Sequence, residues 1–354
     1  MNCNIMLKRS LNWKWLLVPP LLAPVATGLA ADDDMGSSTN KNRFTLRGRV
    51  GMNIHAKFSN IGSFPAATDI GGTGGGLNHF YDDGYVRVDS GGGYLGQTWY
   101  WGYQNASQIS GNNILFHSSS ANVGASQDVT DDPQYGLEMV YNRDIGPLGS
   151  GSKCRWGMEV AFGWNGIGIR DNQTLHADLT QVTDAYAFTP GTTPPGAPYN
   201  GTFGGPGFTI SDTPNRSVAT IANGATINGV RDLQADLFSG RIGPYFEFPL
   251  SSKFQLTLSG GLAVGALYSD FSFSERISYG PNSITRSGSR TDGDILYGGF
   301  AGANVTYKFD DRWNASLGAQ FESLGSRSHS VGGHKYELDM TKSVYVSFGL
   351  GYSF

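Results

Sequence analysis

The chain has 354 residues, a formal net charge of −4 and only 15% charged residues, against roughly 25% in soluble domains. Its mean hydropathy is −0.26, and no apolar run after residue 31 approaches the ~18 residues of a transmembrane helix, which excludes a helical membrane protein. A transmembrane barrel stays open, because its alternating strands average to near-neutral hydropathy. Nothing in the charge points to a nucleic-acid partner.

Residues 1–30 have the pattern of a secretory signal peptide. A positively charged region precedes an apolar stretch that ends in the small residues Gly28 and Ala30, so we expect cleavage after Ala30. Residues 31–42 would then form a short periplasmic N-terminal segment. Cys3 would leave with the signal peptide, and Cys154 would remain without a disulfide partner.

The segment from Phe44 to Phe58 alternates between two kinds of side chain, as a β-strand does. Its even positions are mostly apolar. Its odd positions include four basic side chains: Arg47, Arg49, His55 and Lys57. Four basic groups would be costly in a dry core, so we expect this face to line a polar lumen and the apolar face to meet lipid.

The same alternation recurs in seven further segments: 135–142, 154–164, 238–250, 254–268, 295–309, 313–322 and 344–354. Their lengths are close to or above the ~9–11 residues of a tilted crossing. The pattern predicts an all-β protein, an antiparallel transmembrane β-barrel, with eight strands. Aromatic residues gather beside the three short connections, 146–152, 249–253 and 310–312, as in the girdle at a membrane interface.

Two of the long connections are unusual. Residues 59–133 and 171–229 would be extracellular insertions, and loops of such length are usually functional or disordered. The first contains an aromatic-rich stretch at 94–103, so we expect it to be partly folded. It could instead supply two further crossings, which leaves ten strands as the alternative. The connections at 274–293 and 323–335 would be shorter outer loops.

The C-terminal strand carries the most informative pattern. Apolar or aromatic residues occupy every second position up to the end: Val346, Phe348, Leu350, Tyr352 and Phe354. This resembles the C-terminal assembly signature of bacterial outer-membrane β-barrels, and the strands of the barrel predicted over 43–354, without its two insertions, resemble the small OmpA/OmpX type. The resemblance implies Sec-type export to the outer membrane of a Gram-negative-type bacterium. Its implied partners are outer-membrane lipid, periplasmic chaperones and the barrel-assembly machinery.

The expected lumen-facing charges are the first candidate site. They are Arg47, Arg49, Glu138, Arg155, Glu159, Arg241, Glu247, Lys308 and Glu322. Eight strands enclose an interior just wide enough for side chains, and opposite charges crowded there should pair. The pairs would either block the barrel or form a narrow gated pore, and the sequence does not say which residues pair.

Catalytic and metal chemistry have weaker support. Ser328, His329, Ser330 and His334 lie near Glu322 and Glu337, and serine, histidine and an acid can form a nucleophilic site. Some small barrels of the resembled superfamily are lipid-A deacylases or proteases. The deacylase signature His-x-Ser-Asn is missing here, because Val331 and Gly332 follow Ser330.

Acidic clusters are the last candidates. They lie at 32–34, 82–83, 131–132 and 292–294, and none has the spacing of a calcium-binding loop. We therefore expect no enzyme, cofactor or metal. The predicted function is a membrane-anchored scaffold that presents surface loops for envelope integrity or surface interaction. A small porin or ligand channel is the first alternative, and an outer-membrane lipid or peptide hydrolase is the second.

Overall fold

The computed structural model describes residues 41–354 except 68 and 151. The predicted signal peptide and its cleavage site lie outside these residues. Eight antiparallel strands dominate the structure: β1 (Asn42–Met52), β10 (Gln134–Pro147), β11 (Arg155–Asp171), β15 (Asn215–Pro249), β16 (Phe254–Tyr279), β17 (Asn282–Lys308), β18 (Trp313–Ser323) and β21 (Ser343–Ser353).

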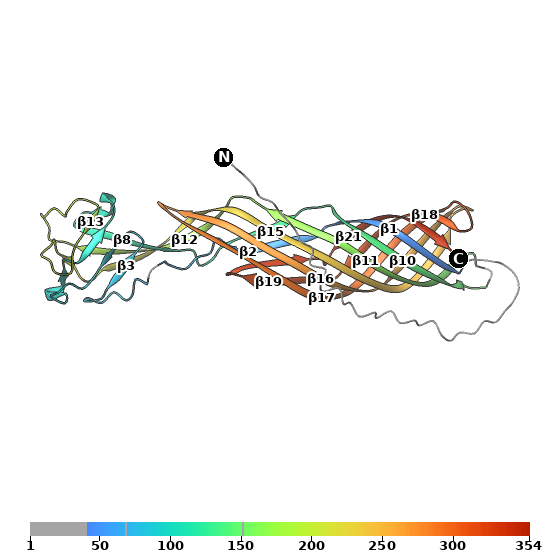
Figure 1. Ribbon diagram of the computed structural model, residues 1–354, viewed down its shortest axis with the longest axis horizontal. Helices are drawn as coiled ribbons and strands as arrows, with labels where there is room; N and C mark the ends of the chain where they lie inside the picture. Colours follow the sequence, from blue (N-terminus) through green and yellow to red (C-terminus); the bar gives the residue numbers. More distant parts are fainter. Residues whose placement is uncertain (1–40, 68, 151) are drawn as a thin grey trace, which may run out of the picture. The chain divides into compact units, whose positions relative to one another are not determined.

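These eight strands form a closed ring (Figure 1). Its order is β11, β10, β1, β21, β18, β17, β16 and β15, and β15 pairs back onto β11. Because the ring is closed, each of these eight strands is paired on both sides within it. The prediction of an antiparallel β-barrel is confirmed. Neither insertion adds a strand to the ring.

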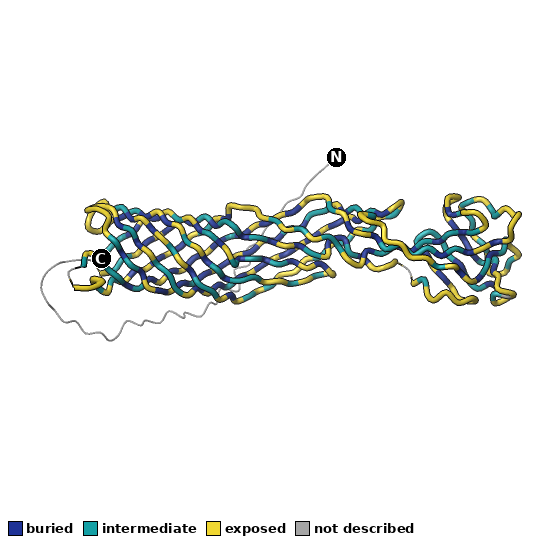
Figure 2. The backbone as a smooth tube through the Cα atoms, turned by 180° about the vertical axis from the view of Figure 1, so that it is seen from behind, coloured by how far each residue is buried: buried dark blue, intermediate teal, exposed yellow. Residues whose placement is uncertain are grey.

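An apolar belt covers the outside of the ring at the end with the short turns. Along β16, the outward side chains of Leu262, Val264 and Tyr268 are 72%, 43% and 59% exposed. The alternation of buried and exposed residues along the ring strands is visible in Figure 2. Aromatic rings cluster beside the short turns, with centroid distances of 5.1 Å for Phe254–Tyr307 and 5.2 Å for Trp313–Tyr352. This belt is the surface that meets lipid.

Beyond the belt, the polarity of both faces reverses. The outward side of β16 changes from Tyr268 to the exposed polar residues Asp270 and Ser272. Its inward side changes from Thr257 to the buried Leu267 and Phe271. An outer surface of polar residues over inward apolar side chains is typical of a water-soluble β-structure. We call this part of the barrel, which begins after Tyr268 on β16, the wall.

Four shorter strands complete the wall: β2 (His55–Ile61), β9 (Ala125–Thr130), β19 (Ser326–Val331) and β20 (His334–Asp339). They form a sheet in the order β19, β20, β2, β9. The expected outer loops at 274–293 and 323–335 were therefore wrong as loops. The first is the continuing β16–β17 hairpin, whose pairing ends at Tyr279 and Asn282, and the second is the β19–β20 hairpin.

One break in the first predicted strand changes which side chains face inward. Asn53, between β1 and β2, has a φ of 62°. In the first half of β2 the even-numbered Ala56 and Phe58 are buried, whereas His55 and Lys57 lie on the outer face. The prediction that His55 and Lys57 line the lumen was wrong, because the interruption shifts the alternation by one residue.

The two insertions build a folded head, which we define as residues 79–120 and 186–211. It contains β3 (His79–Tyr81), β4 (Gly84–Val86), β5 (Gln97–Thr98), β6 (Trp101–Tyr103), β7 (Ile109–Ser110), β8 (Asn113–Ser120), β13 (Tyr199–Asn200), β14 (Ile210–Ser211), and the 3-10 helices η2 (Tyr94–Gly96) and η3 (Ala106–Gln108). The strand β12 (Leu175–Ala187) joins the head to the ring, since it pairs with both β8 and β15.

Within the described residues, no helix is sufficiently long and apolar to cross a membrane.

Candidate functional site

The interior of the belt region is filled by charged side chains from different strands. Glu138 is at their centre. Its carboxylate accepts Arg241 Nη2 at 2.6 Å and Arg49 Nη1 at 3.0 Å, and Arg47 Nη1 lies 3.6 Å away. Arg241 also approaches Glu159 at 3.5 Å. The structure thus brings these five sequence candidates into one network, which a sixth, Glu322, joins through Arg49.

Beyond the first five, the other four sequence candidates lie in three different environments. Glu322 is fully buried and lies 3.6 Å from Arg49. Glu247 pairs with Arg43 at 2.8 Å, and Arg155 pairs with Asp144, two partners that the sequence did not indicate. Lys308 is exposed at the end of β17 and joins no ion pair in the described part of the chain.

Small residues and aromatic rings let these long side chains pack closely. A Cβ atom on Gly349 would lie 2.4 Å from Arg47 Cγ, and one on Gly163 would lie 2.9 Å from Arg49 Nη1. The guanidinium of Arg49 is 3.7 Å from the centre of the Tyr345 ring, a favourable cation–π geometry. The glycines on the inner face therefore make room for the arginines.

The burial of this network shows how tightly the interior is filled. Arg47, Arg49, Glu138, Glu159 and Arg241 are all 5% exposed or less. Side chains lining a water-filled channel would retain solvent contact. At this level the ring is therefore packed shut by paired charges.

An apolar core fills the wall above the charged network. It includes Phe58, Leu237, Phe271, Leu296 and Tyr336, each 2% exposed or less. Water and ions are excluded from such a close-packed apolar interior. The barrel interior thus has two consecutive layers, one ionic and one apolar.

A second ion network lies inside the apolar core. Arg231 donates to Asp171 at 2.7 Å and to Glu275 at 3.1 Å, and His334 Nε2 lies 2.8 Å from Glu275. Burial by itself would raise the pKa of Glu275, but the hydrogen bonds and charges of His334 and Arg231 hold it below its ordinary value. The sequence pattern did not indicate this network, because Asp171, Glu275 and His334 lie in segments that it predicts as outer connections, 171–229, 274–293 and 323–335.

The predicted serine–histidine site does not assemble. His329 points inward, with Nε2 2.7 Å from Asp294 and Nδ1 3.5 Å from Asp292. Ser328 and Ser330 alternate onto the opposite face of β19. Both ring nitrogens of His329 therefore meet carboxylates, and neither neighbouring serine hydroxyl can be activated by this ring.

The remaining catalytic and metal candidates also lie apart. Glu337 is on the outer face of β20, and Glu322 belongs to the ionic network of the belt region. Asp83 pairs with His117 at 2.6 Å. Among residues 41–354 outside 68 and 151, no three histidine, cysteine or acidic side chains are grouped as metal ligands.

The head has its own core, which is rich in aromatic residues. Trp101, Tyr103, Phe116 and Tyr186 are buried there. At its base, Asp184 on β12 accepts Tyr81 Oη and Arg216 Nη2, each at 2.6 Å, and Arg216 Nε at 2.7 Å. Burial, with the hydrogen bond to Asp184, raises the pKa of Tyr81. The two insertions thus form a folded domain with its own core.

One surface of the head presents aromatic rings around a guanidinium. Arg87 lies 4.6 Å from the Phe80 ring centre, 4.9 Å from that of Tyr85 and 5.4 Å from that of Tyr100. Phe203 packs edge-on against Tyr100 and remains 58% exposed. We call these five residues the aromatic platform. Exposed aromatic and arginine side chains are typical of binding hot spots.

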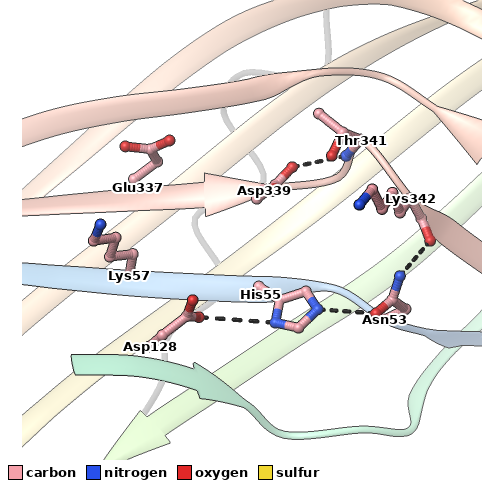
Figure 3. Close-up of a pocket in the computed structure, with 8 residues that line it drawn as sticks. All are labelled: Asn53, His55, Lys57, Asp128, Glu337, Asp339, Thr341 and Lys342. Carbon is pink, nitrogen blue, oxygen red and sulfur yellow. Dashed lines mark hydrogen bonds and ion pairs between the residues drawn. The ribbon is translucent and has the colours of Figure 1, made fainter.

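A pocket of about 300 Å³ lies on the outer face of the wall. Figure 3 shows its eight lining residues, which come from β2, β9, β20 and the segments that follow β1 and β20: Asn53, His55, Lys57, Asp128, Glu337, Asp339, Thr341 and Lys342. Positive and negative groups both line it. His55 and Lys57 were expected in the lumen, and none of the other six residues was among the sequence-predicted lumen or assembly positions.

No protein-family model and no curated protein matches the sequence. The chain is similar to solved structures of OmpT, an outer membrane protease of Escherichia coli (8% identity, 91% of this chain and 99% of that one, TM-score 0.32), and of OprG from Pseudomonas aeruginosa (10%, 89% and 97%, 0.31). It is also similar to Ail of Yersinia pestis, the attachment invasion locus protein (9%, 89% and 99%, 0.26).

At these identities the likeness concerns the fold alone. A closed antiparallel ring with an apolar outer belt and a polar interior defines a transmembrane β-barrel. The ring described above has these features, so the protein is a transmembrane β-barrel, as the strand pattern predicts, and its belt is the surface that meets membrane lipid.

Proposed function

We propose that the protein is a non-conducting outer-membrane anchor that presents its head for binding at the cell surface. The packed interior is the observation that carries this proposal. Glu138 and its three arginine neighbours are 5% exposed or less, and an apolar core follows them along the barrel axis. A solute would have to displace both layers, so the barrel serves as an anchor.

The head supplies the binding function in this proposal. Its buried aromatic core and the Asp184–Arg216 pair hold it in a defined structure. Its aromatic platform keeps Phe203 and Phe80 exposed at 58% and 37%. Aromatic side chains give large contact areas at low conformational-entropy cost, which suits recognition of another molecule.

The first experiment is single-channel recording on the mature chain in a planar bilayer. A heat-dependent gel shift first establishes that the barrel is folded. We expect no current steps. Stable steps from the folded chain would replace the anchor with the porin alternative.

The second experiment tests the head. Proteoliposomes carrying the full chain are applied to an array of glycans and extracellular-matrix proteins. We expect binding that Phe203→Ala and Arg87→Ala reduce, because both remove part of the aromatic platform. Leu95→Ala is the matched control, since Leu95 is an exposed apolar residue of the head at 82%. Binding that all three variants retain would contradict a role for the platform.

A further inference from the structure

The pocket in Figure 3 lies where the lipid-facing belt ends. Met52 on β1 pairs with Val344 on β21, and this is the last apolar pair on the outward face of these strands. Asn53 follows Met52 directly, and Lys342 lies two residues before Val344. The pocket therefore opens at the height where the headgroups of the surrounding lipid begin.

The three carboxylates of the pocket already have partners. Asp339 accepts the backbone N–H of Thr341 at 2.8 Å. Asp128 lies 3.8 Å from His55 Nδ1, and Glu337 lies 3.3 Å from Lys335 Nζ. Each carboxylate that lines the pocket thus has a partner within the wall.

The two ammonium groups of the pocket have no such partner. Lys57 is the cross-strand neighbour of Glu337 and Asp128, yet in the described part of the chain neither Lys57 nor Lys342 forms an ion pair within 4.0 Å. The side chain of Asn53 holds the base of the pocket, donating to the Lys342 carbonyl at 2.7 Å and meeting His55 Nε2 at 2.9 Å. Two free cations therefore face one cavity whose floor is fixed.

The geometry points to a binding site for the phosphate of an outer-leaflet lipid headgroup, held by Lys57 and Lys342. Lysine binds phosphate as a point charge, and basic residues at a membrane surface attract phosphate-bearing lipids. The cavity is larger than a single phosphate needs, so part of the headgroup fits with it. The nearby carboxylates make the pocket unattractive to a free anion, whereas the lipid is concentrated beside it by the belt.

Native mass spectrometry of the full chain in detergent tests this site, with bisphosphorylated lipid A as the probe. We expect Lys57→Gln/Lys342→Gln to weaken its binding about thirtyfold, because two surface lysines that each contribute about 1 kcal/mol toward phosphate-bearing lipid are removed. Lys308→Gln is the matched control, since it removes one exposed positive charge that lies outside the pocket lining. We expect it to leave binding unchanged.

Two further measurements distinguish loss of the site from misfolding and lipid from free phosphate. Lys57→Arg/Lys342→Arg retains both charges and should keep lipid binding, so a loss in the glutamine variant cannot be ascribed to misfolding. Inorganic phosphate should neither bind nor displace the lipid at equal concentration. Equal lipid binding by the glutamine variant and the wild type would overturn the site, and tight binding of inorganic phosphate would overturn its assignment to lipid.

Discussion

Glu138 and Arg241 are 103 residues apart in the sequence and meet at 2.6 Å inside the ring. Their contact is the centre of the ionic network, because Arg47 and Arg49 approach the same carboxylate. One acidic side chain therefore balances three arginines from two strands, with Glu159 and Glu322 at the periphery of the network.

Neutralising Glu138 should destabilise the barrel. In Glu138→Gln, three buried guanidinium groups lose their shared counter-charge, and breaking a buried ion pair costs about 3–5 kcal/mol. Equilibrium urea unfolding in lipid vesicles, followed by tryptophan fluorescence, measures this loss. Glu337→Gln is the control, because Glu337 lies on the outer face of the wall, where a surface ion pair contributes about 0–1 kcal/mol. Similar losses in both variants would show that the network is not a stabilising element.

A charge placed on the lipid-facing belt should impair insertion. Val264 is 43% exposed on the outer face of β16, and a lipid-facing arginine near the membrane midplane costs about 2–4 kcal/mol. We expect Val264→Arg to lower the folded fraction recovered in bilayers, as measured by the heat-dependent gel shift. Ser272→Arg is the matched control, since it lies on the same face of the same strand beyond the belt. Equal yields would place the lipid boundary elsewhere.

The free energy of unfolding should depend on pH through Glu275 and its buried partners in the wall. The pKa of Glu275 is below its ordinary value of 4.5, because His334 and Arg231 outweigh the raising effect of burial. A lowered folded-state pKa contributes stability that is present above the unfolded pKa and is lost as pH falls through the folded pKa. Glu275→Gln should therefore be less stable than the wild type at neutral pH, and the difference should shrink below about pH 4.5.

Urea midpoints of both proteins at a series of pH values measure this difference. Glu337→Gln serves again as the control, because Glu337 is partly exposed and lies outside the buried network. A gap between the wild type and Glu275→Gln that stays constant down to acid pH would contradict the assigned role.

The role of the C-terminal pattern in assembly remains a prediction, and surface levels in cells test it. Phe354 is 55% exposed and ends the outward row of β21, so little packing depends on it. Deleting it should reduce surface levels in cells, since the resembled signature is read by the assembly machinery, and should leave refolding into detergent unchanged. The comparison of the two yields is the measurement. Surface levels equal to the wild type would remove the signature as an assembly signal.

The sequence alone was sufficient for the barrel strands and for most inward and outward positions. Side-chain direction in a strand has a period of two, so the outward row of β16 from Phe254 to Tyr268 is a local property that can be read directly. The short turns could also be located, because a tight connection between paired strands has its own residue composition. The aromatic residues beside them marked one membrane interface.

Only the tertiary structure decided the pairing and the sites. Whether Glu138 meets Arg241 depends on the register and tilt of the three strands β10, β11 and β15, which no local pattern encodes. The break at Asn53 moved His55 and Lys57 from the lumen to the outer pocket, because one extra residue inverts the facing of everything after it. The head likewise unites the two insertions through the contact of Tyr81 with Asp184, and such a long-range contact exists only once β8 has paired with β12.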